Sequence, residues 1–259
     1  MYFCQNKTSL AMEKNNYQGA MQHALGSGFN GKSTSAEVIS GIDLSEKTVL
    51  ITGGNTGIGL ETTKILAAAG AKVIVGARDL EKARKNLEGI SNVEIEELDL
   101  INPSSIDSFA DKFLASNRPL HVLINNAGIM WVPLRKDERG IESQFAVNYL
   151  AQFHLVARLW PTLVKAQGAR VINVSSSGHQ FGDLDFEDLN FDSREYETLL
   201  AYGQSKTACN LFAMELDKRG KNMGVSAFSL HPGSIGGTEQ SLKVQRPRFG
   251  ALPVPYFRI

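Results

Sequence analysis

The chain has 259 residues, which is enough for one large α/β domain with a substantial core. Its 27 basic and 27 acidic residues balance, and this excludes a strong overall field for nucleic acid or for a membrane surface. The cysteines, Cys4 and Cys209, lie far apart, so the sequence predicts no disulfide framework and favours a reducing compartment.

No apolar run approaches the ~20 residues that a membrane-spanning helix needs. Polar and charged residues, among them Lys7, Glu13 and Lys14, interrupt every N-terminal stretch that could serve as a signal peptide. The histidines are dispersed without the spacing of metal ligands. We therefore expect a cytoplasmic protein with no membrane span, no nucleic-acid partner and no metal site.

Residues 1–40 are rich in Asn, Gln, Ser, Thr and Gly without a sustained period, which predicts a flexible N-terminal arm. From residue 45, β-branched runs alternate with helical patterns. The predicted strands are 48–52, 72–76, 93–98, 121–125, 170–175 and 225–231. The predicted helices are a segment ending at Ala69, 80–87, a segment that Pro103 opens, 142–165 and 199–218.

This alternation, without hairpin signals, predicts an α/β fold: a Rossmann-like, doubly wound parallel sheet with helices on both faces. We expect one domain over residues 45–238. Residues 239–259 contain three prolines and no helical or strand period, so they are expected to form an irregular C-terminal tail.

A glycine-rich turn, Thr52-Gly53-Gly54-Asn55-Thr56-Gly57-Ile58-Gly59, lies between the first strand and the first long helix. Glycines allow close approach of the backbone to a pyrophosphate, and amides at a helix N-terminus face its negative charge. A glycine cluster alone is usually only a turn. Because this one follows a buried strand and precedes an Ala-rich helix, we interpret it as a nucleotide cofactor site.

The tip of the second strand bears on the choice of cofactor. A carboxylate there would bind the ribose of NAD, whereas an arginine accommodates the 2′-phosphate of NADP. The chain has Ala77 and then Arg78, which favours NADP(H) over NAD(H). The alternative is that Arg78 is a solvated surface residue and that Asp79 only caps the next helix.

Polar residues also follow the third and fourth strands. Asp99, with Leu100 after it, closes the third strand, where a carboxylate could meet the adenine edge or could equally be a loop residue. Asn125-Asn126-Ala127-Gly128 ends the fourth strand at the same edge of the sheet, where open α/β sheets bind ligands. Turn formation is the ordinary alternative for such residues.

Tyr202 and Lys206 are four residues apart, so a helix would place them on one face. A phenol titrates near ~10, and a fixed cation a few ångströms away lowers that pKa. The pair alone could occur by chance on a solvated helix.

The motifs together resemble the short-chain dehydrogenase/reductase family over about residues 45–238. The matching features, in the family's order, are the glycine turn, Asn125-Asn126-Ala127-Gly128, Asn148, Ser176, Tyr202-x-x-x-Lys206 and Pro232-Gly233.

The resemblance implies a role for each matched residue. Tyr202 would give a proton to a carbonyl or take one from an alcohol, while Lys206 would lower the pKa of Tyr202 and hold the nicotinamide ribose. Ser176 would orient and polarise the substrate oxygen. Asn148 would bend its helix and hold a water that links Lys206 to a proton relay. Without this context, Ser176 is more simply a cap and Asn148 a buried residue with local bonds.

The cofactor-binding residues that we expect are Gly53, Asn55, Thr56, Gly57, Ile58, Gly59, Arg78, Asp99, Leu100, Asn126, Ala127, Gly128, Tyr202, Lys206, Pro232, Gly233 and Ile235. The last three would contact the nicotinamide amide. Hydride transfer places negative charge on a carbonyl oxygen, so a hydroxyl and an acidic phenol directed at it would stabilise the transition state.

The segment from Ser176 to Tyr202 spans 26 positions and contains an acidic, aromatic insert over residues 182–191. The insert resembles the retinol-dehydrogenase-like and WW-domain-oxidoreductase-like branch, which often acts on hydrophobic aldehydes, ketones and alcohols. We therefore expect a small hydrophobic alcohol or carbonyl substrate. Because family members are commonly dimers or tetramers, a homo-oligomer is also expected.

The sequence departs from the family after Ile235, where Gly236 and Gly237 delay the expected threonine to Thr238. The segment that follows does not resemble the family's substrate lid and last strand, so we expect both to be missing. The leading function is an NADP(H)-dependent oxidoreductase. The alternatives are a catalytically inactive protein that binds a nucleotide or a partner, and a nucleotide-sugar epimerase, against which the Asn125–Gly128 segment argues.

Overall fold

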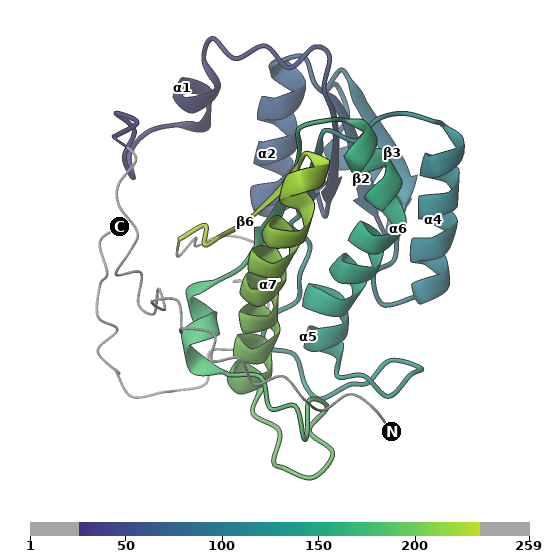
Figure 1. The fold of residues 1–259 in the computed structure, drawn as a ribbon, viewed down its shortest axis with the longest axis vertical. Helices are drawn as coiled ribbons and strands as arrows, with labels where there is room; N and C mark the ends of the chain where they lie inside the picture. The colour runs from purple at the N-terminus through teal and green to yellow at the C-terminus, as the bar shows by residue number, and fades with distance from the viewer. Residues whose placement is uncertain (1–25, 234–259) are drawn as a thin grey trace.

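The computed structural model describes residues 26–233. Ile235, Thr238, the C-terminal tail, the expected loss of the lid and last strand, and most of the N-terminal arm therefore lie outside the described residues. Within them, the chain alternates strands and helices as the sequence predicts (Figure 1).

The described strands form one parallel sheet in the order β3-β2-β1-β4-β5-β6. This arrangement confirms the prediction of a Rossmann-like, doubly wound sheet. The strands are β1 (Thr48–Thr52), β2 (Lys72–Ala77), β3 (Val93–Glu97), β4 (Val122–Asn125), β5 (Ala169–Val174) and β6 (Val225–Leu230).

The predicted helices are also present, with additions that the sequence did not indicate. The predicted ones are α2 (Gly57–Ala68), α3 (Leu80–Asn86), α4 (Pro103–Ala115), α6 (Ala151–Lys165) and α7 (Thr198–Gly220). The additional ones are α1 (Ser35–Ile39) and the 3₁₀ turns η3 (Ser177–Phe181) and η4 (Lys221–Met223). The segment expected as one helix from residue 142 begins instead as α5 (Ser143–Phe145) and the π-helical turn η2 (Ala146–Leu150). None of the helices in residues 26–233 is both long and apolar enough to cross a membrane.

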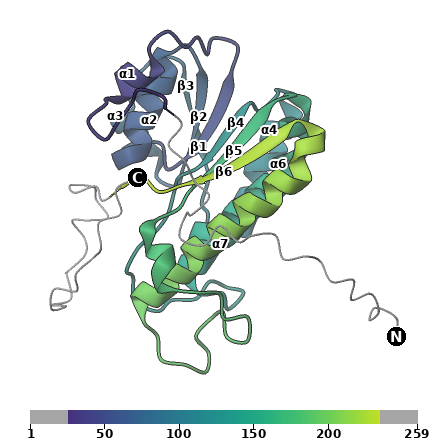
Figure 2. The ribbon, with the colours of Figure 1, turned by 60° about the vertical axis from the view of Figure 1, so that its left-hand side comes forward.

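Alternating strand residues build a hydrophobic core on each face of the sheet. On β1, Leu50 packs toward α4, α6 and α7, whereas Val49 and Ile51 pack toward α2 and α3. Figure 2 shows these two groups of helices on opposite sides of the sheet. Both cores consist almost entirely of aliphatic and phenylalanine side chains, so burial of apolar area is the main force that holds the layers together.

Helix α4 shows how local sequence sets the packing. Asn102 caps its first turn by accepting a hydrogen bond from the Ser104 N–H at 3.0 Å, and proline follows at the first helical position. The buried side chains Ile106, Phe109, Ala110 and Phe113 then recur with helical spacing and meet the sheet.

The strand order reverses direction between β1 and its neighbour β4. In open α/β sheets this switch point opens a crevice at the carboxyl ends of the strands, where ligands bind. The fold therefore places the glycine turn after β1 and the Asn125–Gly128 segment after β4 side by side.

Helix α7 and η3 meet backbone to backbone at Gly203. A Cβ atom added at Gly203 would lie 2.6 Å from the Gly182 nitrogen and 2.8 Å from the Gly178 oxygen. Gly203 stands directly after Tyr202, so this close contact fixes the distance between α7 and the segment that carries Ser176.

We predict that Gly203→Ala destabilises the protein, although the same change in an open helix stabilises by ~1 kcal/mol. The added methyl has only rigid backbone to displace, and overpacking of this kind costs about 1–3 kcal/mol. The measurement is the midpoint of thermal or urea unfolding. Lys218→Ala, exposed on the same helix, is the matched control and should change it little. A midpoint for Gly203→Ala at or above that of the unchanged protein would contradict the contact.

Candidate functional site

The glycine turn after β1 needs glycine for reasons of geometry. Gly53 has φ of 66° and Gly57 has φ of 54°, both in the left-handed region that side chains disfavour. A Cβ at Gly59 would lie 2.3 Å from the Gly53 oxygen and 2.6 Å from Asn126 Nδ2. The turn can therefore pack tightly against the end of β4 only with these residues.

The N-terminus of α2 differs from those of the neighbouring helices. Asp79 caps α3 and Asn102 caps α4, each through its side chain. Within residues 26–233, the Thr56 side chain makes no capping hydrogen bond to the first turn of α2. Ile58 and Gly57 belong to that turn, and Asn55 precedes it as a buried residue. An uncapped helix start beside a glycine turn suits a bound phosphate group.

The Thr52 hydroxyl joins the ends of β1 and β4. It accepts hydrogen bonds from the backbone N–H groups of Asn126 and Ala127, both at 3.0 Å, and a longer one from Gln152 Nε2 at 3.3 Å. In return, Asn126 Nδ2 donates to the Thr52 carbonyl at 2.9 Å. The two segments at the switch point are thus held together by neutral hydrogen bonds that are at least partly buried.

Arg78 and Asp79 follow β2 and have different surroundings. The Asp79 side chain accepts from the Lys82 N–H at 3.0 Å, as the capping alternative anticipates. Arg78 is exposed and forms no ion pair with any residue in 26–233. Its guanidinium is therefore available to an anionic group that lies over the end of β2.

Asp99 and Leu100 follow β3 at the same edge. The Asp99 carboxylate accepts from the Ile101 N–H at 3.2 Å, and the Asp99 N–H donates to Ser105 Oγ at 2.9 Å. These bonds order the loop, and the Leu100 side chain is buried in the core. At the far strand of the edge, Pro232 and Gly233 follow β6, and Gly233 has φ of 88°.

Tyr202 and Lys206 lie one turn apart on α7. The Lys206 ammonium is 5.6 Å from the centre of the Tyr202 ring and donates to the Val174 carbonyl at 2.9 Å. Lys206 is only 5% exposed, whereas Tyr202 is half-buried. A buried lysine thus stands beside a half-buried tyrosine.

Asn148 lies in the π-helical turn and connects three segments. Its carboxamide accepts from the Ile129 N–H at 2.8 Å and donates to the Ile129 carbonyl and to Ser205 Oγ, both at 2.9 Å. Its backbone carbonyl accepts from the Cys209 thiol at 3.2 Å. A Cβ at Gly128 would lie 3.0 Å from Asn148 Oδ1 and 3.5 Å from Lys206 Nζ, so these residues share one small volume.

Ser176 lies near the Tyr202 ring, next to Gly178. Its Oγ accepts from the Gly178 N–H at 3.0 Å at the start of η3, as the capping alternative anticipates. A Cβ at Gly178 would lie 2.8 Å from Tyr202 Cε1 and 3.3 Å from Ser176 Oγ, so the hydroxyl and the phenol ring flank this glycine. Because Ser176 is the acceptor toward Gly178, its own proton remains available for another oxygen.

Two buried glutamines near the site were not predicted. Gln144 Nε2 donates to Tyr196 Oη at 2.9 Å and to the Thr198 carbonyl at 3.0 Å. Gln144 precedes Asn148 by four residues, and Thr198 precedes Tyr202 by four. Helical spacing could therefore have indicated that Gln144 and Thr198 lie on the same helix faces as these two site residues. Gln204 Nε2 donates to the Leu189 carbonyl at 2.8 Å, which attaches the insert to α7.

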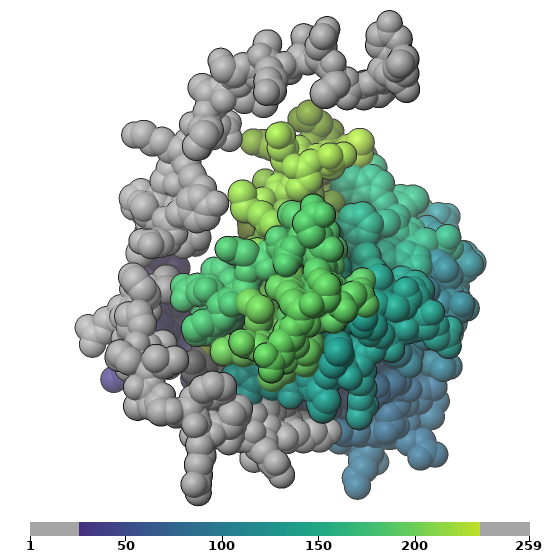
Figure 3. Space-filling view, turned by 90° about the horizontal axis from the view of Figure 1, so that it is seen from below, coloured from purple at the N-terminus to yellow at the C-terminus, as the bar shows by residue number. Residues whose placement is uncertain are grey.

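The segment between η3 and α7, which contains the insert, is folded around Asp188 and Arg194. The Asp188 carboxylate accepts from the N–H groups of Asp192 at 2.6 Å, Ser193 at 3.0 Å and Arg194 at 3.1 Å. Arg194 in turn donates to Gln204 Oε1 at 3.0 Å. Figure 3 views the molecule from below and shows this green segment at the centre of that end, beside the teal residues before α5.

Tyr196 connects the insert to the loop after β4. Its hydroxyl lies 3.1 Å from the Val132 carbonyl and 3.2 Å from the Glu142 carboxylate. Burial, together with the negative charge of Glu142, raises the pKa of Tyr196 to about 12. Tyr196 therefore stays protonated and serves as a hydrogen-bonded anchor.

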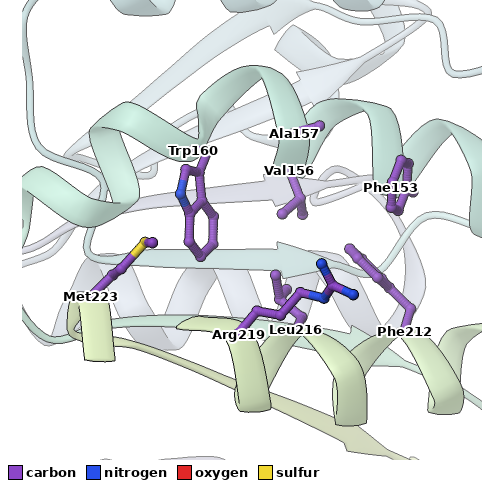
Figure 4. A pocket seen from close by; sticks show the side chains of 8 residues that line it. All are labelled: Phe153, Val156, Ala157, Trp160, Phe212, Leu216, Arg219 and Met223. Carbon is purple, nitrogen blue, oxygen red and sulfur yellow. The ribbon is translucent and has the colours of Figure 1, made fainter. Parts of the chain in front are cut away.

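An apolar groove of about 490 Å³ lies elsewhere, between α6 and the second half of α7 (Figure 4). Its lining residues are Phe153, Val156, Ala157, Trp160, Phe212, Leu216, Arg219 and Met223. None of them is a predicted site residue, so the groove is separate from the cluster around Tyr202.

The chain is similar to known proteins over most of its length. The short chain dehydrogenase family matches residues 47–247, most of the chain. Retinol dehydrogenase 12 of Mus musculus is 42% identical over 200 residues, which cover 75% of this chain and 63% of that protein. WW domain-containing oxidoreductase of Gallus gallus is 40% identical over 220 residues, which cover 80% of this chain and 53% of that protein. The chain thus spans less than two thirds of the length of these relatives.

Solved structures share the fold as well. An uncharacterized protein from Mycobacterium paratuberculosis aligns with a TM-score of 0.67 and 42% identity, over 74% of this chain and 70% of that one. A metagenomic short-chain oxidoreductase in complex with NADP aligns with a TM-score of 0.61 and 27% identity, over 74% of this chain and 84% of that one.

We predict that Asp188 makes stability depend on acid pH. Hydrogen bonds from the backbone of residues 192–194 lower its pKa from 3.8 to about 2. Because the folded pKa is lower than the unfolded value, the stabilising contribution is complete above about pH 4 and is lost as pH falls toward 2. Asp188→Asn should therefore lower the melting temperature at pH 7, and the difference from the unchanged protein should shrink toward pH 2.

The measurement is thermal unfolding across pH 2–7. Asp183→Asn, an exposed residue of the same insert, is the matched control and should leave the melting temperature unchanged. A constant difference between Asp188→Asn and the unchanged protein at every pH would contradict a role for the carboxylate charge.

Proposed function

The chain belongs to the short chain dehydrogenase family, and on this premise we propose that it is an NADP(H)-dependent oxidoreductase that interconverts an alcohol with an aldehyde or ketone. The observation that carries the proposal is the common location of Tyr202, Lys206, Ser176 and Asn148. A Cβ atom added at Gly128 would contact Asn148 and Lys206, and one added at Gly178 would contact Ser176 and Tyr202. A carbonyl beside Tyr202 would therefore meet a phenol, a hydroxyl and a nearby cation at once.

The residues at the carboxyl edge of the sheet fit a phosphorylated dinucleotide. The glycine turn and the uncapped amides of α2 would bind the pyrophosphate, and Arg78 would bind a 2′-phosphate. Asp99 would meet the adenine edge, and Pro232 with Gly233 would contact the nicotinamide amide. When bound, the cofactor supplies a hydride to the carbonyl carbon or removes one from the alcohol carbon.

The chain's own residues would handle the proton. In the reductive direction, the carbonyl carbon gains the hydride with its two electrons, and the carbonyl oxygen gains the proton of the Tyr202 hydroxyl, so an alcohol results. The Ser176 hydroxyl would donate a hydrogen bond to the same oxygen and stabilise its negative charge. The buried Lys206 cation would stabilise the phenolate that remains, until a proton from solvent restores the phenol.

The substrate that we propose is a small hydrophobic alcohol or carbonyl compound. Support comes from relatives that are named retinol dehydrogenases and from the partly exposed aromatic residues near the site, Trp131 and Phe181. Self-association and a cytoplasmic location also belong to the proposal. The latter rests on the scarcity of cysteine, which suits a reducing compartment.

A second candidate function is nucleotide binding without turnover. The residues that would bind the phosphate groups lie in the turn after β1, at the start of α2 and directly after β2, whereas the residue that would transfer the proton lies on α7, so the phosphates could bind without turnover. The two candidates differ in whether a bound cofactor is ever oxidised or reduced.

We predict that Tyr202→Phe abolishes turnover and leaves NADPH binding nearly unchanged. The substitution removes only the hydroxyl, so no proton reaches the substrate oxygen, and loss of a general acid typically costs 10²–10⁴-fold in rate. The measurements are the decrease in NADPH absorbance with a panel of aldehydes and NADPH binding by calorimetry. Tyr149→Phe, which removes the hydroxyl of a tyrosine on η2 whose ring packs against Phe145, is the matched control. NADPH binding without turnover by the unchanged protein would favour the second candidate.

We also predict that Arg78→Ala weakens NADPH binding and leaves NADH binding unchanged. The exposed guanidinium would pair only with the 2′-phosphate, which NADH lacks, and a charge-assisted hydrogen bond contributes about 1.5–3 kcal/mol. The expected result is about a tenfold or greater increase in the Kd for NADPH, measured by calorimetry. Arg84→Ala, an exposed arginine on α3, is the matched control. Equal losses for both cofactors would mean that Arg78 does not select between them.

A further inference from the structure

The loop after β4 contains a bulky residue in an unusual conformation. Trp131 has φ of 56°, in the left-handed region that large side chains rarely adopt. Such conformations persist only where the surroundings determine them, and they concentrate at functional sites. Trp131 nevertheless keeps 38% of its surface exposed.

Buried side chains hold the backbone on both sides of Trp131. The Trp131 N–H donates to Gln144 Oε1 at 3.0 Å. Two residues earlier, Asn148 binds both the N–H and the carbonyl of Ile129. One residue later, the Val132 carbonyl accepts from Thr198 Oγ1 at 2.9 Å and from the Tyr196 hydroxyl at 3.1 Å.

These bonds place the loop beside the catalytic face of α7. At one end, Gly128 adjoins Lys206, and at the other, Val132 is bonded to Thr198. Thr198 and Lys206 are two turns apart, a rise of about 12 Å. Tyr202 lies midway between Thr198 and Lys206 on α7. The loop bends at Trp131 and contacts α7 on both sides of the level of Tyr202.

We propose that the Trp131 indole forms the apolar wall against which the hydrocarbon part of the substrate packs beside Tyr202. The inference rests on the proposed oxidoreductase function and assigns the residue that selects substrates by their apolar size. Gln144 and Tyr196 are positioning residues, since they reach the substrate only through the loop. An indole offers a large, rigid apolar surface, so the residue favours long or ring-containing substrates over short ones.

Fluorescence tests the location directly, because the sequence contains only two tryptophans, Trp131 and Trp160. In Trp160→Phe, all tryptophan emission comes from Trp131. With NADP⁺ present, 1-decanol should shift or quench that emission. In Trp131→Phe, the emission comes from Trp160 in the distant groove and should not respond. A response of Trp160 alone, or of neither tryptophan while decanol is being oxidised, would overturn the proposal.

Kinetics with two aldehydes tests the role in specificity. Trp131→Ala should lower kcat/KM for decanal about tenfold, the scale of a lost apolar contact, and change kcat/KM for propanal less than twofold. Trp131→Phe should restore most of the activity on decanal. Met214→Ala, which truncates an exposed apolar side chain elsewhere on α7, is the control and should change neither value.

The two proposals can fail separately. Equal losses of kcat/KM for decanal and propanal in Trp131→Ala would show a general structural effect and overturn the role of the indole, while the oxidoreductase function would stand. If the unchanged protein reduces neither aldehyde and does not bind NADPH, the proposed function fails, and the inference fails with it.

Discussion

The carboxamide of Asn148 is the interaction on which the rest of the candidate site depends. It is buried and uses its donor and acceptor atoms on Ile129 and Ser205, so it binds the loop after β4 to α7. A buried amide that loses a partner carries an unmatched desolvation cost, which gives this arrangement little freedom. The π-helical turn brings Asn148 to this position, and π-turns often occur at functional sites.

The position of Tyr202 follows from a second constraint, the close contact of glycine backbones around α7. Gly203 packs on Gly182, and Gly178 packs on the Tyr202 ring. These contacts leave no room to slide the helix along η3. Hydrogen bonds from Asn148 therefore set one side of the site, and close packing sets the other. Lys206 is held between them by the Val174 carbonyl and lies beside the Tyr202 ring, and no carboxylate of residues 26–233 forms an ion pair with it.

The sequence was sufficient to predict the sheet and its main helices, because the spacing of apolar residues and the glycines at turns and helix ends are local signals. It placed the glycine turn and Asn125–Gly128 at one edge because parallel strands end on the same side. The folded insert was not predictable, since it depends on side-chain contacts such as that of Arg194 with Gln204 on α7, for which the sequence carries no local signal. The left-handed Trp131 was equally hidden, because bulky side chains disfavour that conformation and only distant residues impose it.

Two helical segments enclose the loop after β4, and each contacts it through residues at helical spacing, four apart on the first segment and eight apart on the second. Gln144 and Asn148 bind it from α5 and η2, while Thr198 and Lys206 adjoin it from α7. Gln144 also bonds directly to the Thr198 carbonyl, which keeps the two segments in register. A shift of either helix by one turn would break contacts at both ends of the loop at once. The loop, Tyr202 and Lys206 therefore keep fixed positions relative to one another. The register of the two helical segments sets the geometry around Tyr202.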